Sequence, residues 1–156
     1  MRKLIAPVLV LVAAVLSAPP TSVADPGCER ISLSGQTQLN LANGRIEGVL
    51  SGTAEGEPIS IFSSTAILGQ EQRGAVSFLT TSHVFTVLSG EHAGAQLTTL
   101  DNARLVATPT AGVSHAVSNV DIVSGGSGFL VGNGNIDFRG GITATWKHIN
   151  GQVCGL

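Results

Sequence analysis

The sequence predicts a small all-β domain, folded as a closed antiparallel barrel in preference to a β-sandwich, with its two ends joined by a disulfide. Three observations lead to this prediction. The pattern of apolar and polar residues is of the strand kind almost throughout. Turn signals are dense and divide the chain into about eight to ten short segments, a spacing typical of sandwiches and barrels. One cysteine lies near each end of the expected mature chain.

The first 24 residues predict a secretory signal peptide. Arg2 and Lys3 precede an apolar run, and small residues and prolines follow it. The run is shorter than the roughly 20 residues that span a bilayer, so a retained membrane anchor is the less favoured alternative. Cleavage is expected after Ala24, with Ala18 as the alternative position. We therefore expect an exported mature chain, residues 25–156, that forms one all-β domain.

The first elements after this leader are two strands joined by a tight turn. Asn43-Gly44 separates residues 37–42 from residues 45–52 and predicts a hairpin, because both residues tolerate positive φ. Gly, Pro, Asn and Asp clusters mark the later breaks in the same way. Further turns are expected at residues 55–58, 69–74, 90–94, 101–102, 109–112, 140–141 and 150–151.

Residues 76–88, VSFLTTSHVFTVL, form the clearest strand. They are rich in Thr, Val and Phe, and their alternation places Leu79, His83 and Phe85 on one face. The one helical turn that we expect covers residues 64–72, STAILGQEQ, where a Ser or Thr could cap it.

Cys28 and Cys154 predict a single disulfide between the two ends of the domain. An even pair in an exported protein indicates a bridge, and two cysteines allow only one connectivity. Free thiols and a metal pair are the alternatives, but no histidine adjoins either cysteine. The bridge would tie the first strand to the last. That arrangement fits a closed barrel, although a sandwich would also accept it.

The run GGSGFLVGNGN at residues 125–135 is as rich in glycine as a ligand-binding loop. It lacks the flanking residues and elements that such loops need. Dinucleotide and Walker loops need a following helix or a Gly-Lys-Ser/Thr sequence, and this run continues into an alternating strand pattern. The calcium nonapeptide needs an Asp where Leu130 stands. We therefore expect bends, bulges or positive φ in this run, with Phe129 or Leu130 packed inward.

The spacing of Gly125, Gly126, Gly128, Gly132 and Gly134 resembles the G-G-T-G-x-[FY]-x-G-A-x-G signature of small secreted β-barrels of the dirigent and allene-oxide-cyclase-like kind. The resemblance covers this run only. It implies an eight-stranded antiparallel barrel with a central cavity. It carries no catalytic residue across, because the glycines are structural in those families too.

Charge and composition exclude two classes of function. Six Lys or Arg and ten Asp or Glu give the expected mature chain a formal charge of −4. A basic stripe is absent, and the whole sequence has five Phe, one Trp and no Tyr. Nucleic-acid binding, which needs phosphate neutralisation and base stacking, is therefore not expected. A polybasic patch for a membrane surface is also absent, and with so short an apolar run stable membrane insertion is not expected.

The candidate ligand-cavity residues are His83, Phe85, His115, Trp146 and His148. Alternation places the three histidines on faces that also hold apolar residues, so a barrel could turn them toward a shared interior. The histidine spacing matches no metal motif, and neither a metal nor another cofactor is expected. For each histidine, a position packed in the core or partly exposed is the favoured interpretation.

The functional prediction is a non-catalytic binding or surface-interaction module with a small apolar ligand cavity or a surface partner. Hydrolytic chemistry is not predicted, because the sequence has no G-x-S-x-G elbow and Asp101 has no partner that the sequence identifies. One alternative is an isomerase- or cyclase-like barrel that acts on a hydrophobic small molecule. Another is a structural component of the cell envelope.

Overall fold

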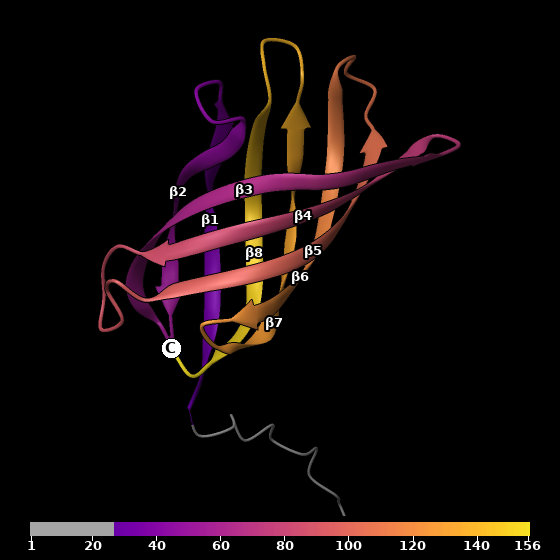
Figure 1. Ribbon diagram of the computed structural model, residues 1–156. Coiled ribbons are helices and arrows are strands. Elements are labelled where there is room, and N and C mark those ends of the chain that lie inside the picture. The colour runs from indigo at the N-terminus through magenta and orange to yellow at the C-terminus, as the bar shows by residue number, and fades with distance from the viewer. Residues whose placement is uncertain (1–26) are drawn as a thin grey trace, which may run out of the picture.

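The computed structural model of the protein describes residues 27–156, which form an eight-stranded antiparallel β-barrel (Figure 1). Each strand pairs with the next along the chain, and β1 pairs with β8 to close the sheet. The predicted barrel is thus confirmed. The predicted signal peptide, residues 1–24, lies outside the described residues. The strands are β1 (Cys28–Asn40), β2 (Arg45–Ala54), β3 (Glu57–Arg73), β4 (Val76–Val87), β5 (Gln96–Ala107), β6 (Val113–Ser124), β7 (Ser127–Asp137) and β8 (Thr143–Cys154).

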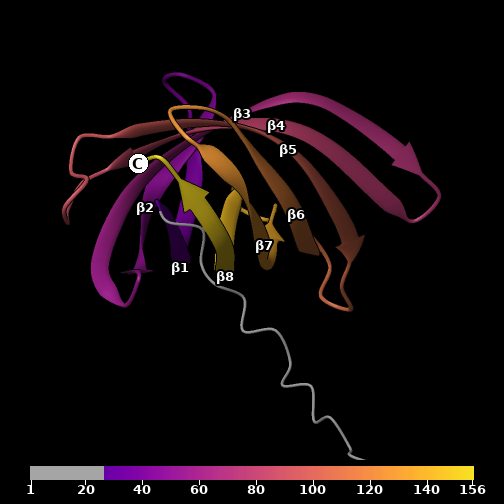
Figure 2. The same cartoon turned by 90° about the horizontal axis from the view of Figure 1, so that it is seen from below.

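The predicted disulfide is also confirmed. Cys28 and Cys154 face each other in the β1–β8 register and are joined covalently across 126 positions of sequence. The bond lies at the lower end of the barrel in Figure 1, where the C-terminus also lies (Figure 2 shows this end). None of the described residues belongs to a helix that could cross a membrane.

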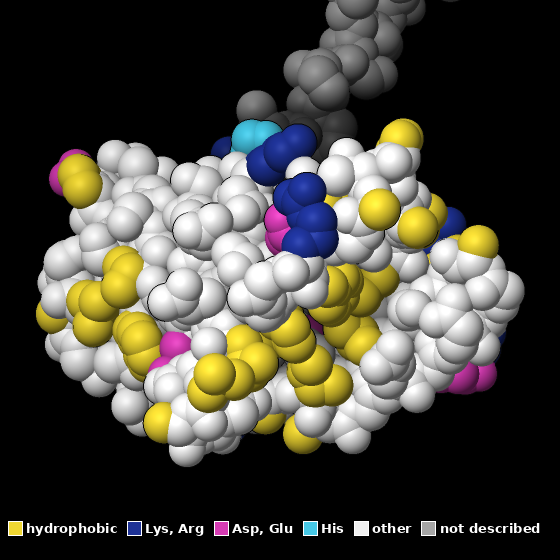
Figure 3. Space-filling view, turned by 90° about the horizontal axis from the view of Figure 1, so that it is seen from above, with side chains coloured by type: hydrophobic (Ala, Val, Ile, Leu, Met, Phe, Trp, Pro, Cys, Tyr) yellow, Lys and Arg dark blue, Asp and Glu magenta, His cyan; other side chains and the backbone are white. Residues whose placement is uncertain are grey.

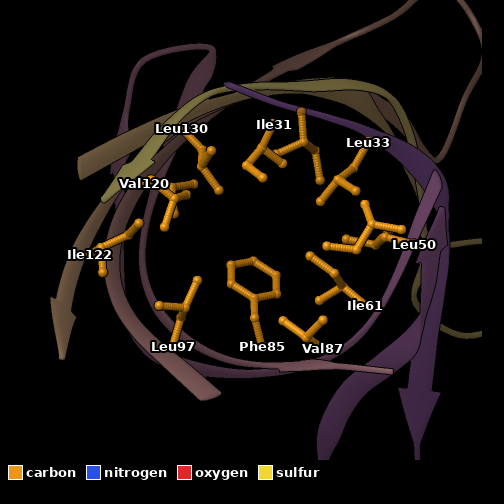
Figure 4. Close-up of a cluster of buried hydrophobic side chains, with 13 residues drawn as sticks. Ile31, Leu33, Leu50, Ile61, Phe85, Val87, Leu97, Val120, Ile122 and Leu130 are labelled. Carbon is orange, nitrogen blue, oxygen red and sulfur yellow. The ribbon is translucent and has the colours of Figure 1, made fainter. Parts of the chain in front are cut away.

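The half of the barrel nearest this disulfide, here called the lower half, is filled with large apolar side chains. They point inward from all sides of the barrel (Figure 4). Burial of one such side chain contributes about 1.5–3 kcal/mol, so this cluster is the main source of stability. Its members are Ile31, Leu33, Leu50, Ile59, Ile61, Phe85, Val87, Leu97, Val120, Ile122, Leu130, Ile149 and Val153.

The opposite half, here called the upper half, contains fewer buried apolar side chains. Its apolar cluster consists of Leu105, Ala116, Ile136 and Ala144, with the partly buried Leu79, Ile142 and Trp146 packed against it. Three loops of four or five residues lie at this end (Figure 1). They connect β1 to β2, β5 to β6, and β7 to β8. The upper half is thus less completely filled than the lower half.

Four local predictions are wrong. Residues 64–72 continue β3 instead of forming a helical turn, because β4 pairs with this segment along its length and β2 pairs with residues 64 and 65. The irregularity in this segment is a bulge between Ile67 and Gly69. The turn expected at residues 69–74 lies at residues 74–75, because β3 continues to Arg73. Residues 101–102 lie inside β5 and residues 150–151 inside β8, where we expected turns. In these segments, pairing with neighbouring strands overrides the local preference of the sequence.

The glycine run begins at the turn from β6 into β7 and continues along β7. Gly125 and Gly128 have positive φ, 82° and 124°, so the positive φ predicted in this run is confirmed. Leu130 packs inward with 2% of its surface exposed. Phe129 points outward and is 57% exposed.

The rest of the run accommodates Trp146 on β8. A Cβ on Gly132 would lie 3.1 Å from the indole Cζ3, so glycine leaves the space that the ring needs. Gly134 pairs with Trp146, and the register then jumps so that Asn133 pairs with His148. Lys147 is the extra residue of this β-bulge. The bulge keeps Trp146 directed inward while the strand bends.

We expect Gly134→Ala to lower the free energy of unfolding by about 1–3 kcal/mol, because overpacking forces the backbone to move. A Cβ there would overlap the carbonyl oxygen of Thr145 and lie 3.0 Å from the Cα of Trp146. Gly140→Ala is the matched control, since nothing lies within 4 Å of its added Cβ. Urea unfolding of both variants measures the difference, and equal midpoints would contradict the structural role of Gly134.

Candidate functional site

A group of polar side chains interrupts the apolar interior between the lower and upper halves. These side chains come from five of the eight strands, and each has less than a tenth of its surface exposed. Buried polar groups of this kind need hydrogen-bond partners, because an unsatisfied group loses its hydration without compensation. The members are Thr37, Ser63, Thr65, Thr81, His83, Thr99, Asp101 and Ser118.

The centre of this group is a hydrogen-bonded pair, His83 and Asp101. His83 alternates inward on β4 and Asp101 on the neighbouring β5, so the two strands bring them together. The imidazole Nε2 lies 2.5 Å from the carboxylate Oδ2, and Asp101 is completely buried. Thr81 Oγ1 lies 3.4 Å from the same oxygen. A buried carboxylate is tolerated only with such partners.

The second ring nitrogen of His83 is also occupied. Nδ1 lies 2.8 Å from Thr65 Oγ1 and 3.4 Å from Ser63 Oγ, both on β3. An ionised Asp101 can only accept, so Nε2 carries a proton, and in the neutral ring Nδ1 accepts from a hydroxyl. The ring stacks on Phe85 at a centroid distance of 5.2 Å. His83 is therefore held from three sides.

Two buried polar atoms among the described residues have no hydrogen-bond partner in the protein. They are Asp101 Oδ1 and Ser118 Oγ. Leaving such an atom unsatisfied costs about 1–3 kcal/mol, so each marks a place where a water or a ligand would be stabilising. Ser118 is the more informative of the two, because it also lines empty space.

Two small cavities adjoin Ser118, and both are lined by His83 and Trp146 as well. The lower one has a volume of about 10 Å³ and contacts Phe85. The upper one has a volume of about 40 Å³ and extends to Ile67, which is 47% exposed, so it reaches the upper rim of the barrel. A water occupies about 30 Å³ of liquid, so the upper cavity holds roughly one.

The face of the barrel above this cavity is apolar in its middle. Viewed from above, hydrophobic side chains gather between polar ones (Figure 3). Ionised groups stand on the adjoining loops and strand ends. Arg139 donates to Asp137 and lowers the pKa of that carboxyl to about 2. Hydrogen bonds from Asn40 and Ser64 lower the pKa of Glu47. Both carboxylates therefore stay charged at neutral and mildly acidic pH.

The structure brings together three of the five predicted cavity residues and separates the other two. His83 and Trp146 line both cavities, and Phe85 lines the lower one. His115 does not reach the interior, because Ala116 and Ser118 take the inward positions of β6. His148 is also outside: the extra residue Lys147 changes the alternation, so Trp146 faces inward and His148 is exposed. The three histidines therefore do not converge on a shared interior, and His115 and His148 follow the interpretation that placed each histidine in the core or partly exposed.

Sequence reasoning predicted only His83 among the members of the polar group and missed the rest, including Thr65, Asp101 and Ser118. Asp101 was assigned to a turn, although residues 97–105 alternate as Leu, Thr, Asp, Ala, Leu on one face. An aspartate in such a run signals a buried carboxylate that needs a partner. Thr65 was lost in the same way, within the expected helical turn. Ser118 carries no comparable signal.

The described residues offer no ready metal site. No group of three or more His, Cys, Asp or Glu among residues 27–156 is placed to hold a metal ion. The buried pair supplies at most one carboxylate oxygen, since both nitrogens of His83 are occupied.

The fold and the site together define a class: a disulfide-closed, eight-stranded antiparallel barrel with a buried polar centre beneath an apolar mouth. No family model matches the chain, and no curated protein or solved structure matches it.

Proposed function

We propose that the protein is an exported, non-catalytic binding module that takes a small, largely apolar molecule with one hydrogen-bonding group into the upper half of the barrel. The observation that carries the proposal is the Ser118 hydroxyl. It is buried without a partner, and it lines both cavities. Ligand sites commonly combine apolar walls with a few polar groups that fix orientation.

The ligand's polar group would bond to Ser118 Oγ, which can donate and accept. Its apolar part would lie between Ile67 and Leu79, which line the upper cavity near its opening. The ring of Trp146 would form one wall. The enclosed volume of about 40 Å³ admits a few atoms, so a longer ligand keeps its remainder at the rim.

Export is the second part of the proposal. The Cys28–Cys154 disulfide supports it, because such bonds persist mainly in oxidising compartments. The amino-terminal pattern around Arg2 and Lys3 supports it independently. Export places the barrel where it can meet small molecules outside the cytoplasm.

Fluorescence of Trp146 tests ligand binding directly, because it is the only tryptophan of the chain and lines both cavities. With 1-hexanol as the probe, we expect a saturable change of emission in the wild-type protein. Ser118→Ala should weaken the apparent affinity by about three- to tenfold, since it removes one hydrogen bond.

Ser124→Ala is the matched control, because Ser124 lies on the same strand and is exposed. It should bind 1-hexanol as the wild type does. A change of emission that never saturates, or equal affinities for Ser118→Ala and the wild type, would refute the proposed site.

An isomerase- or cyclase-like activity on a similar ligand is the second candidate. The buried pair of His83 and Asp101 favours it, because a carboxylate-bound imidazole is a common acid–base unit. It ranks second because Asp101 and Thr65 already occupy both ring nitrogens. A proton would have to reach the ligand through the hydroxyl of Thr65 or Ser63.

A further inference from the structure

A second and larger concave site lies on the outside of the barrel. We infer that this outer groove binds an acidic saccharide, by side chains alone and independently of the interior site. The groove has a volume of about 640 Å³, within the range of roughly 300–1,000 Å³ found for ligand sites. It crosses β3, β4, β5 and β6, and its outward side chains include Arg73, Phe78, Thr80, Asn102, Arg104 and Asn119.

The strand register arranges these side chains in two rows. Phe78 pairs with Arg104, and Thr80 pairs with Asn102, which pairs with Asn119. Asn102 and Arg104 alternate with buried Asp101, Ala103 and Leu105 and therefore point away from the interior. The β3–β4 hairpin extends past the neighbouring strands beside these rows (Figures 1 and 2).

Of the two arginines in the groove, Arg73 is paired with a carboxylate and Arg104 is not. Arg73 makes two hydrogen bonds to Glu71, at 2.7 and 2.9 Å, and its guanidinium carbon lies 5.4 Å from the Phe78 ring centroid. Arg104 takes part in none of the ion pairs formed by residues 27–156. Acidic residues outnumber basic ones in that range. An exposed guanidinium in this setting selects a carboxylate, which it can bind with two hydrogen bonds.

The remaining polar groups favour hydroxyls. The carboxamides of Asn102 and Asn119 each offer donors and an acceptor in one plane, and Thr80 adds a hydroxyl. Phe78 is 37% exposed and presents an apolar surface for the C–H face of a sugar ring. A carboxylate, several hydroxyls and an apolar ring face occur together in a uronic acid.

The middle of the groove offers side chains and no free strand edge. There β4, β5 and β6 are paired on both sides, whereas residues 66–73 of β3, at the border of the groove, pair with β4 alone. Recognition across β4, β5 and β6 must therefore come from the side chains. The two rows cross the strands and lie two residues apart along them. This spacing suits successive sugar rings.

Isothermal titration with trigalacturonic acid tests this site. We expect saturable binding that weakens as salt is added, because the carboxylate contact is exposed to screening. Arg104→Gln should weaken binding about tenfold by removing the charged contact. Arg30→Gln, an exposed arginine on β1, is the matched control and should bind as the wild type does.

Two further ligands decide the chemistry. Galactotriose, which lacks the carboxylates, should bind at least about tenfold more weakly than trigalacturonic acid. Triglutamate, which has carboxylates without sugar hydroxyls, should show no saturable binding. Equal binding of triglutamate, equal binding by the Arg104→Gln variant, or no binding of trigalacturonic acid would each overturn the assignment.

Discussion

Asp101→Ala is expected to lower the free energy of unfolding by about 3–5 kcal/mol, the usual cost of breaking a buried ion pair by removing one partner. Asp101 is completely buried, and its Oδ2 lies 2.5 Å from His83 Nε2. Without the carboxylate, the Nε2 proton has no acceptor in an apolar interior. Urea unfolding followed by the fluorescence of Trp146 measures the loss.

Asp121→Ala is the matched control, because Asp121 is exposed on the adjacent β6. It should change the stability by less than about 0.5 kcal/mol. Replacing both partners, as His83→Leu/Asp101→Val, should recover most of the loss, since apolar residues of similar volume need no pairing. If Asp101→Ala and Asp121→Ala unfold at the same urea concentration, the pair has no structural role. If Asp101→Ala does not fold, a stable double variant still demonstrates the coupling.

The second large effect concerns the disulfide. Cys28→Ser/Cys154→Ser should lower the free energy of unfolding by about 2–5 kcal/mol, because the bond restricts a long loop in the unfolded chain. The two cysteines are 126 positions apart, and they close the β1–β8 pairing at its end. Urea unfolding of the variant and of the wild type measures the difference.

Wild-type protein unfolded with a reductant is the control, and it should match the double serine variant. We expect the folded variant to keep its strand content, because the β1–β8 hydrogen bonds do not depend on the bond. Equal stability of the oxidised wild type and the variant would contradict this account. So would a non-reducing peptide map with Cys28 and Cys154 unlinked.

The fold could be predicted because its causes are local or unambiguous. Alternation along residues 76–88 correctly placed His83 and Phe85 on one face, which in the structure is the inward face of β4. The Asn43-Gly44 pair correctly placed a hairpin turn between β1 and β2. Two cysteines allowed a single bridge. These features depend on neighbours in sequence or on counting, and both are visible in the chain itself.

The candidate site was less predictable because it depends on register. A bulge at Lys147 changed the direction of His148, and nothing in the sequence around it specifies that extra residue. Asp101 was mistaken for part of a turn, because Asp-Asn is a common turn pair and its cross-strand partner is distant in sequence. The position of Ser118 between His83 and Trp146 likewise follows only from closure of the sheet.

Native mass spectrometry of the protein recovered from the medium of an exporting host tests binding inside the barrel most directly. The account predicts a small molecule that stays bound to the folded chain and is released when the chain is denatured. Ser118→Val, which adds apolar bulk to the wall of both cavities, should carry much less of it. A wild-type chain that is bare in this measurement, and whose Trp146 emission shows no saturable response to 1-hexanol, would contradict the proposed function.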